Sequence, residues 1–191
     1  EGALRDDLEP TAARAMAVLD PVRLVITNWD EVMGTGHLEP CSAPVHPRAP
    51  QCGERLFSFG RDLWVERADY SESPGPGFFR LYPGNAVRLK FGYVVRCTGA
   101  VRTASAELVQ IHAVVLPGTK SGSAGAAAIK VKGTITWVGA ADCVQAEVRL
   151  YERLFTVAQP GAGDSFLNEL HPESARRVTA CVEPSLREAL R

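Results

Sequence analysis

The sequence predicts an all-β fold made of two small β-barrels, with the distal barrel inserted into the proximal one. Three observations predict it. Short stretches of alternating apolar and polar residues recur along the 191-residue chain, turns rich in Pro and Gly separate them, and helical patterns are few. Composition also shifts near residue 72 and again near residue 146, which divides the chain into an outer and an inner part.

The first third of the chain predicts a helical start followed by strands. Residues 1–19 are rich in helix formers, and we expect them to be the end of a helical region that begins upstream. Residues 22–29 alternate as a strand, whereas residues 34–54 are rich in Pro and Gly, which favours an irregular surface loop. Residues 56–70 predict two strands on either side of Gly60-Arg61-Asp62.

A linker at residues 71–77, with two prolines and two glycines, precedes the stretch around which the sequence is organised. Residues 78–96 predict two short strands joined by the turn Pro83-Gly84-Asn85, because Pro fixes one turn torsion while Gly and Asn tolerate the left-handed ones. Beyond the turn the residues alternate, so Val87, Leu89 and Phe91 share one face and Arg88 and Lys90 share the other.

This alternation predicts one face that builds a core and one that carries positive charge. Arg80 precedes the turn, and the hairpin would bring it near the same cationic face. Guanidinium groups pair with phosphates and base edges, and flat rings stack on bases, so cations beside aromatics suit single-stranded nucleic acid. The possible stacking residues are Phe78, Phe79 and Tyr82.

The remainder of the chain predicts four more strands, a flexible excursion at residues 117–128 and a short helical piece at residues 165–170. Ser165 is a plausible N-cap for that piece. The predicted strands are residues 106–115, 129–138, 144–150 and 178–184.

Charge is strongly segregated although the chain as a whole carries a net charge of −1. Residues 73–141 hold eight basic residues and a single acid, Glu107, so this segment carries +7 and the remainder −8. A basic middle segment within an acidic frame suits contact with a polyanion, where counterion release supplies affinity. The alternative is a solvated strand face without a partner.

Several other classes of protein are disfavoured. The five cysteines are odd in number and contain no CxxC pair, so neither a disulfide framework nor a zinc site is indicated, and we expect reduced thiols. No apolar run is long enough for a membrane span, and the acidic start is unlike a signal peptide, which favours the cytoplasm. No GxGxxG, P-loop, HExxH or GxSxG motif occurs, so we assign no catalytic residue and no metal ligand.

Longer strings resemble the C-terminal region of bacterial-type glutaminyl-tRNA synthetases, in consistent order over nearly the whole chain. They are RAMAVLDPVRLVITN (14–28), LWVERADY (63–70), RLYPGNAVRLKFGYVVRC (80–97), KVKGTITWV (130–138), EVRLYERLFT (147–156), FLNELHPES (166–174) and VEPSL (182–186).

The resemblance implies a region of two β-barrels that binds the anticodon of glutamine-accepting tRNA. It implies a proximal barrel from residues 20–72 and 147–191, a distal barrel from residues 73–146, and a helical linker at residues 1–19 that follows an upstream catalytic domain. That domain would use ATP with magnesium, whereas this chain holds neither a cofactor nor the HIGH- and KMSKS-type motifs. Relatives continue past EPSL, so we expect a proximal barrel truncated at its C-terminus, and a monomer.

The resemblance also assigns RNA-binding residues by position. Arg14 resembles an arginine that contacts the anticodon, and Arg80, Arg88 and Lys90 resemble basic residues that hold its bases and phosphates. Phe78 is a candidate stacking residue, and Arg48 stands where some relatives carry Asn. The chain departs from its relatives at Gly77 and Phe79, where they carry a polar residue and a lysine, and inward packing of Phe79 is one alternative to stacking.

Two alternatives remain from the sequence. One is the equivalent domain of an archaeal- or eukaryotic-type glutamyl-tRNA synthetase, which has the same fold but binds a different anticodon. The other belongs to a different class, namely an RNA-binding or purely structural β-barrel unrelated to synthetases. Comparing binding to the glutamine and glutamate anticodon stem-loops would distinguish a glutaminyl from a glutamyl synthetase domain. The absence of any anticodon preference would favour a β-barrel unrelated to synthetases.

Overall fold

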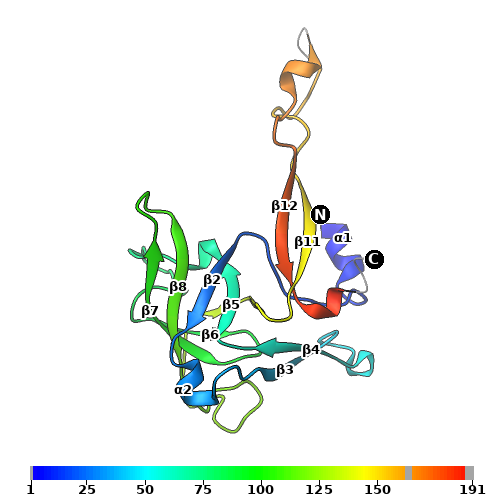
Figure 1. Ribbon diagram of the computed structural model, residues 1–191. Helices are drawn as coiled ribbons and strands as arrows, with labels where there is room; N and C mark the ends of the chain where they lie inside the picture. The colour runs from blue at the N-terminus through cyan, green and yellow to red at the C-terminus, as the bar shows by residue number, and fades with distance from the viewer. Residues whose placement is uncertain (1, 162–164, 188–191) are drawn as a thin grey trace.

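The structure is a computed structural model that describes residues 2–161 and 165–187. It confirms the all-β prediction, because a seven-stranded sheet curves into a nearly closed barrel and the helices are few and short (Figure 1). The barrel strands are β2 (Pro21–Ile26), β5 (Asp62–Glu66), β6 (Ala86–Leu89), β7 (Val94–Arg102), β8 (Leu108–Val115), β9 (Thr134–Ile135) and β10 (Trp137–Gly139).

One short segment closes the barrel. The sheet order is β10-β5-β2-β8-β7-β6-β9, so β9 and β10 lie at opposite edges although only Thr136 separates them in the chain. Residues on one side of Thr136 pair with β6, and residues on the other side pair with β5. Both edges of the sheet are therefore held by consecutive residues.

The barrel core is aromatic and is covered by a hairpin of β3 (Glu39–Pro44) and β4 (Glu54–Phe59). Phe59 of β4 packs with ring centroids 5.0 Å from Trp29 and 4.8 Å from Trp137, and all three side chains are buried. Trp29 begins the short helix α2 (Trp29–Met33). Tilted and edge-on contacts of this kind stabilise an aromatic pair beyond the area it buries.

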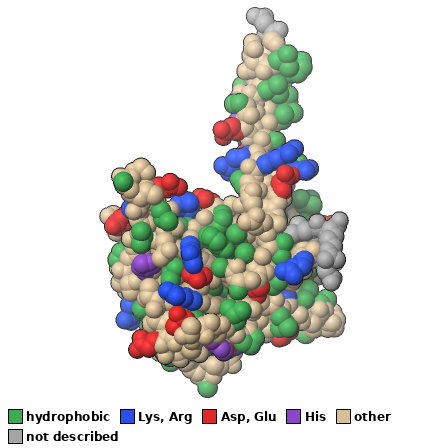
Figure 2. All heavy atoms as spheres, in the orientation of Figure 1, with side chains coloured by type: hydrophobic (Ala, Val, Ile, Leu, Met, Phe, Trp, Pro, Cys, Tyr) green, Lys and Arg blue, Asp and Glu red, His purple; other side chains and the backbone are tan. Residues whose placement is uncertain are grey.

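A separate three-stranded sheet consists of β1 (Ala17–Val18), β12 (Ala175–Val182) and β11 (Val144–Tyr151). Beyond β1, the β11–β12 pair projects from the body as an arm (Figure 1). Figure 2 shows hydrophobic side chains along this arm and charged ones at its base. Its exposed hydrophobic residues are Tyr151, Leu154, Val157, Phe166 and Leu167.

Both predicted helical pieces are confirmed. Helix α1 spans Gly2–Leu8, and a 3-10 turn on the arm spans Phe166–Glu169. Ser165 occupies the N-cap position of that turn, as predicted, but its side chain makes no capping hydrogen bond. The other 3-10 turns are Pro50–Cys52, Arg67–Asp69 and Pro184–Leu186.

Three local predictions need correction. Residues 34–54 are not one irregular loop, because Cys41 and Ala43 alternate into the core and so form strand β3 with a proline near each end. The strands at 54–59 and 62–66 both exist, but they pair in different sheets and not with each other. Residues 78–82 form no strand; only Leu81 makes an isolated bridge, to Tyr70, and the hairpin instead joins β6 to β7.

Strand pairing crosses the predicted domain boundary near residue 72. β2 and β5, from segment 20–72, share one sheet with five strands from segment 73–146, and β2 pairs directly with β8. β12, from segment 147–191, pairs with β11 and β1 in the other sheet. The division of the chain into a proximal and a distal barrel stays a prediction. No helix of the described residues is long and apolar enough to cross a membrane.

A buried ion pair joins the barrel's covering hairpin to the end of β12. The Arg55 guanidinium lies 3.2 Å from the Glu183 carboxylate, and only 4% and 1% of these side chains are exposed. Glu183 also accepts a hydrogen bond of 2.9 Å from the backbone N–H of Met16, just before β1. Burial lowers the pKa of Arg55, and the charge of Glu183 opposes that effect.

Replacing Arg55 with Met should therefore destabilise the chain by about 3–5 kcal/mol, because Glu183 would remain buried without its counter-charge. Urea unfolding measures this loss. The control is Arg61→Met, which removes the partner of Asp30 from an exposed pair and should cost less than about 1 kcal/mol. Equal losses in the two variants would contradict a special role for the buried pair.

Candidate nucleic-acid interface

The segment that precedes β6 is irregular but firmly held. The backbone N–H of Leu81 donates to Asp69 O (2.9 Å), and Leu81 O accepts from the N–H of Ser71 (3.0 Å). On the other side, the side-chain amide of Asn85 donates to Arg80 O at 2.7 Å. Leu81 is fully buried, so it anchors the segment while its neighbours reach the surface. The side chains of residues 78–82 therefore start from a fixed backbone.

Arg80 is positioned by a buried carboxylate. Its Nη1 lies 2.9 Å from Oδ1 of Asp69, and 52% of the Arg80 side chain is exposed compared with 9% for Asp69. Burial raises the pKa of Asp69, whereas the charge of Arg80 acts to lower it. A guanidinium has five N–H donors, so this contact orients Arg80 and leaves donors for a further acceptor.

The two phenylalanines before Arg80 differ in exposure. Phe78 is half-buried, whereas 47% of Phe79 is exposed, so inward packing of Phe79 is wrong. Lys132 Nζ lies 5.1 Å from the Phe79 ring centroid, within the range of a cation–π contact. Phe79 and Tyr82 line a groove of about 310 Å³ together with Asn85, Ala86, Lys130, Val131 and Lys132.

Arg88 of β6 and Lys90, which follows that strand, have unequal surroundings. Lys90 is exposed, and its Nζ lies 5.4 Å from the Phe91 ring centroid. Arg88 instead donates to Gly92 O (3.3 Å), to Thr119 O (2.9 Å) and to Ala126 O, as well as to the hydroxyl of Ser121. Three of these four acceptors belong to the 117–128 excursion. Arg88 therefore holds that excursion against the barrel, and its predicted contact with nucleic acid stays a prediction.

Arg14 and Arg48 come together at a separate place. Nη2 of Arg14 lies 2.7 Å from one carboxylate oxygen of Glu9, and Nη2 of Arg48 lies 3.6 Å from the other. The Arg48 side chain is 74% exposed. Within the described residues, no hydrogen bond or ion pair links either arginine to residues 78–90. The six predicted site residues thus fall into two groups.

The sequence pattern did not predict that Lys130 and Lys132 lie beside Phe79. Alternation predicted a strand over residues 129–138 with both lysines on one face, but the strands here are only Thr134–Ile135 and Trp137–Gly139, and residues 129–133 form none. The backbone supplies the missing information, because the N–H of Arg88 donates to Gly133 O at 2.9 Å and so places residues 130–133 beside β6.

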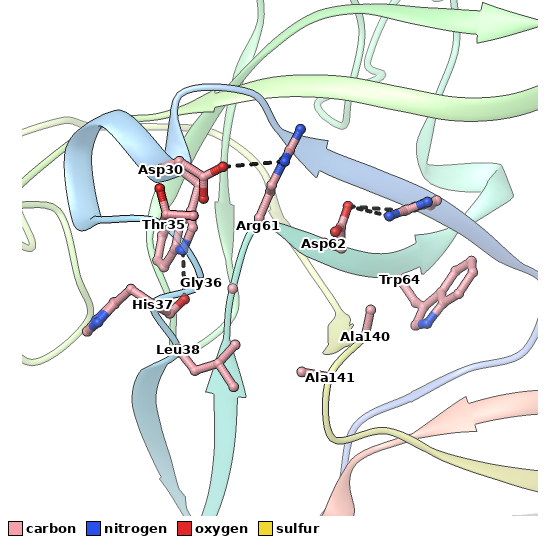
Figure 3. Close-up of a pocket in the computed structure, with 13 residues that line it drawn as sticks. Asp30, Thr35, Gly36, His37, Leu38, Arg61, Asp62, Trp64, Ala140 and Ala141 are labelled. Carbon is pink, nitrogen blue, oxygen red and sulfur yellow. Dashed lines mark hydrogen bonds and ion pairs between the residues drawn. The ribbon is translucent and has the colours of Figure 1, made fainter.

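A second groove, of about 530 Å³, lies between α2 with the loop after it and residues 60–64 (Figure 3). Its charges are balanced. Arg61 lies 3.3 Å from Asp30, and Arg23 lies 2.9 Å from Asp62. Because each arginine has its own carboxylate, this groove offers a polyanion little net attraction. Among the described residues, no three His, Cys, Asp or Glu side chains gather as a metal site.

An exposed face that combines cations with aromatic rings is a feature of modules that bind single-stranded nucleic acid. Comparison with known families narrows that class of modules. Residues 12–115 match the model of the class I (E and Q) tRNA synthetase anticodon-binding domain, and residues 134–191 match a second model with the same description. The chain belongs to this family of anticodon-binding domains.

Curated relatives point the same way. The chain is 54% identical over 190 residues to a glutamine–tRNA ligase of Cupriavidus necator, which covers 99% of the chain and 32% of that protein. It is 52% identical over 190 residues to that of Ralstonia pickettii, with 99% and 32% covered, and 54% identical over 187 residues to that of Bordetella pertussis, with 97% and 31% covered. The chain thus spans about a third of the length of these relatives.

Arg88→Ala should loosen the 117–128 excursion, because that substitution removes the side chain that holds it. Amide hydrogen exchange in these residues should accelerate at least severalfold while β7 and β8 stay protected. Lys90→Ala, two positions further along the chain and just after β6, is the matched control and should leave the exchange unchanged. Unchanged exchange in the Arg88 variant would show that the excursion is held by something else.

Proposed function

We propose that this chain is the anticodon-binding part of a glutamine–tRNA ligase and that it binds the anticodon loop of glutamine-accepting tRNA. The observation that carries the proposal is the match to glutamine–tRNA ligases, at 52–54% identity over 97% or more of the chain. The family itself includes glutamate enzymes, so an anticodon-binding domain of a glutamyl-tRNA synthetase is the second candidate.

The exposed cations support an RNA ligand. Arg80 has donors to spare beyond its contact with Asp69, which suits hydrogen bonding to a base edge, whereas Lys90 is a point charge suited to a phosphate. Recognition of single-stranded loops in RNA uses such donors together with stacking. In the proposed complex, Arg80 contributes base discrimination and Lys90 contributes affinity. Phe78, Arg14, Arg48 and Arg88 remain proposed contacts that come from the resemblance.

The rest of the reaction is assigned outside this chain. We place ATP and magnesium in an upstream catalytic domain of the parent protein, and no catalytic step is assigned to residues of this chain, which contains none of the nucleotide-binding motifs sought in the sequence. Anticodon binding would act on that domain by coupling, which requires both parts in one polypeptide. The proposal further places the parent protein in the cytoplasm as a monomer.

Filter binding of anticodon stem-loops tests the proposal. The chain should prefer the glutamine stem-loop to the glutamate stem-loop. Arg80→Lys keeps the charge but loses the planar guanidinium fork, so it should reduce that preference by about 1–3 kcal/mol. Lys90→Ala should weaken binding to both stem-loops alike and lower the salt dependence.

Arg61→Ala is the matched control, because this exposed arginine lies at the charge-balanced groove. It should change neither affinity nor preference. Preference for the glutamate stem-loop would support the second candidate. Equal binding of all stem-loops, unaffected by the substitutions at Arg80 and Lys90, would refute anticodon recognition.

A further inference from the structure

The groove beside Phe79 has the features of a nucleotide-binding site and contains none of the six RNA-binding residues predicted from the sequence. It lies on the surface between the 79–86 segment and residues 130–132, and its volume is about 310 Å³. It combines two aromatic rings with two lysines. Neither lysine has a salt bridge within the described residues, in contrast to the paired arginines of the larger groove.

The groove is built rigidly on both sides. Gly133 is buried, and a Cβ at this position would overlap the carbonyl oxygen of Phe79, so glycine permits the close approach that sets Lys132 beside the ring. On the Tyr82 side, the N–H of Asn85 donates to Tyr82 O at 3.0 Å and the N–H of Gly84 donates to Cys97 O at 2.8 Å. These contacts fix the turn that carries Tyr82.

The side chains that line the groove indicate which class of ligand it can bind. An exposed aromatic ring with a cation beside it offers a flat face to a base, and unpaired ammonium groups attract a phosphate. A small apolar ligand would leave the two lysines without an anionic partner, and an inorganic anion would leave the two rings without a stacking partner. An unpaired nucleotide uses both, because it carries a flat base and an anionic phosphate in one unit.

We propose that the groove binds one unpaired nucleotide of the RNA, with its base stacked on Phe79 beside Tyr82 and its backbone phosphate held by Lys130 and Lys132. This inference rests on the proposed function, because the same RNA supplies the nucleotide. It divides the two interactions with the nucleotide between two side chains. Here Lys132 supplies the positive charge, and Phe79 supplies the stacking surface.

The test combines a protein substitution with the removal of single bases from a glutamine anticodon stem-loop. Phe79→Leu keeps an apolar side chain but removes the flat ring, so it should weaken binding of the intact stem-loop about 5- to 150-fold. At one abasic loop position this loss should shrink to less than about twofold, because the base that stacks on Phe79 is already gone. Phe79→Trp keeps a flat aromatic ring at this position and should bind the intact stem-loop about as tightly as the unsubstituted chain.

Two further variants sharpen the test. Tyr151→Leu removes a more exposed aromatic ring from the arm, where 74% of Tyr151 is exposed, and should not change affinity. Lys130→Gln combined with Lys132→Gln should reduce the slope of log affinity against log salt by about 0.7, as expected for the loss of one neutralised single-strand phosphate. Thermal unfolding of each variant checks that the fold is retained.

The outcomes separate this proposal from the proposed function. If Phe79→Leu binds the intact stem-loop as tightly as the unsubstituted chain, or loses the same factor at every abasic position, the groove holds no base, even though Lys90→Ala and Arg80→Lys still affect binding. If the unsubstituted chain binds no stem-loop at all, both proposals are refuted.

Discussion

The segment from Lys130 to Gly139 is the constraint on which the rest of the structure depends. It pairs with β6 through β9 and with β5 through β10, so a single run of residues closes the seven-stranded sheet. Gly133 and Gly139 permit this course, since a Cβ at the first would overlap the Phe79 carbonyl and a Cβ at the second would overlap that of Ser58. The same segment therefore closes the barrel and forms one side of the aromatic groove.

Pairing of charges decides which surfaces can attract RNA. Most arginines of the body have a carboxylate within 4 Å, including Arg23 and Arg61 at the larger groove. Arg80 also has one, but that partner is a buried aspartate that holds the arginine in place while half of its side chain faces solvent. The net positive charge of residues 73–141 can therefore attract RNA where cations such as Arg80, Lys130 and Lys132 are exposed.

The sequence predicted the strand-rich class and most strands well, because alternation is a local signal and the core positions Val87 and Leu89 obey it. It predicted that Arg88 and Lys90 share one strand face, whereas β6 ends at Leu89 and the two side chains have different surroundings. The 117–128 excursion returns over Arg88 and supplies its acceptors, and no local pattern encodes that return. The same limit applies to Phe79, whose partner Lys132 is more than fifty residues away in the chain.

Strand prediction failed where tertiary contacts overrode composition. Prolines at both ends of β3 suggested a loop, yet Cys41 and Ala43 pack into the core and make it an edge strand. Conversely, residues 78–82 have the apolar content of a strand but bridge only at Leu81. The resemblance supplied the assignment to anticodon binding, whereas the structure supplied the partners of each side chain.

Amide chemical-shift mapping by nuclear magnetic resonance tests the location of the RNA surface most directly. Titration with the glutamine anticodon stem-loop should shift the amides of residues 78–90 and 130–133 and leave residues 35–38 and 60–64, around the charge-balanced groove, unchanged. Shifts centred on that groove, with residues 78–90 and 130–133 unaffected, would contradict the assignment of the RNA surface to the face of Phe79, Arg80 and Lys132.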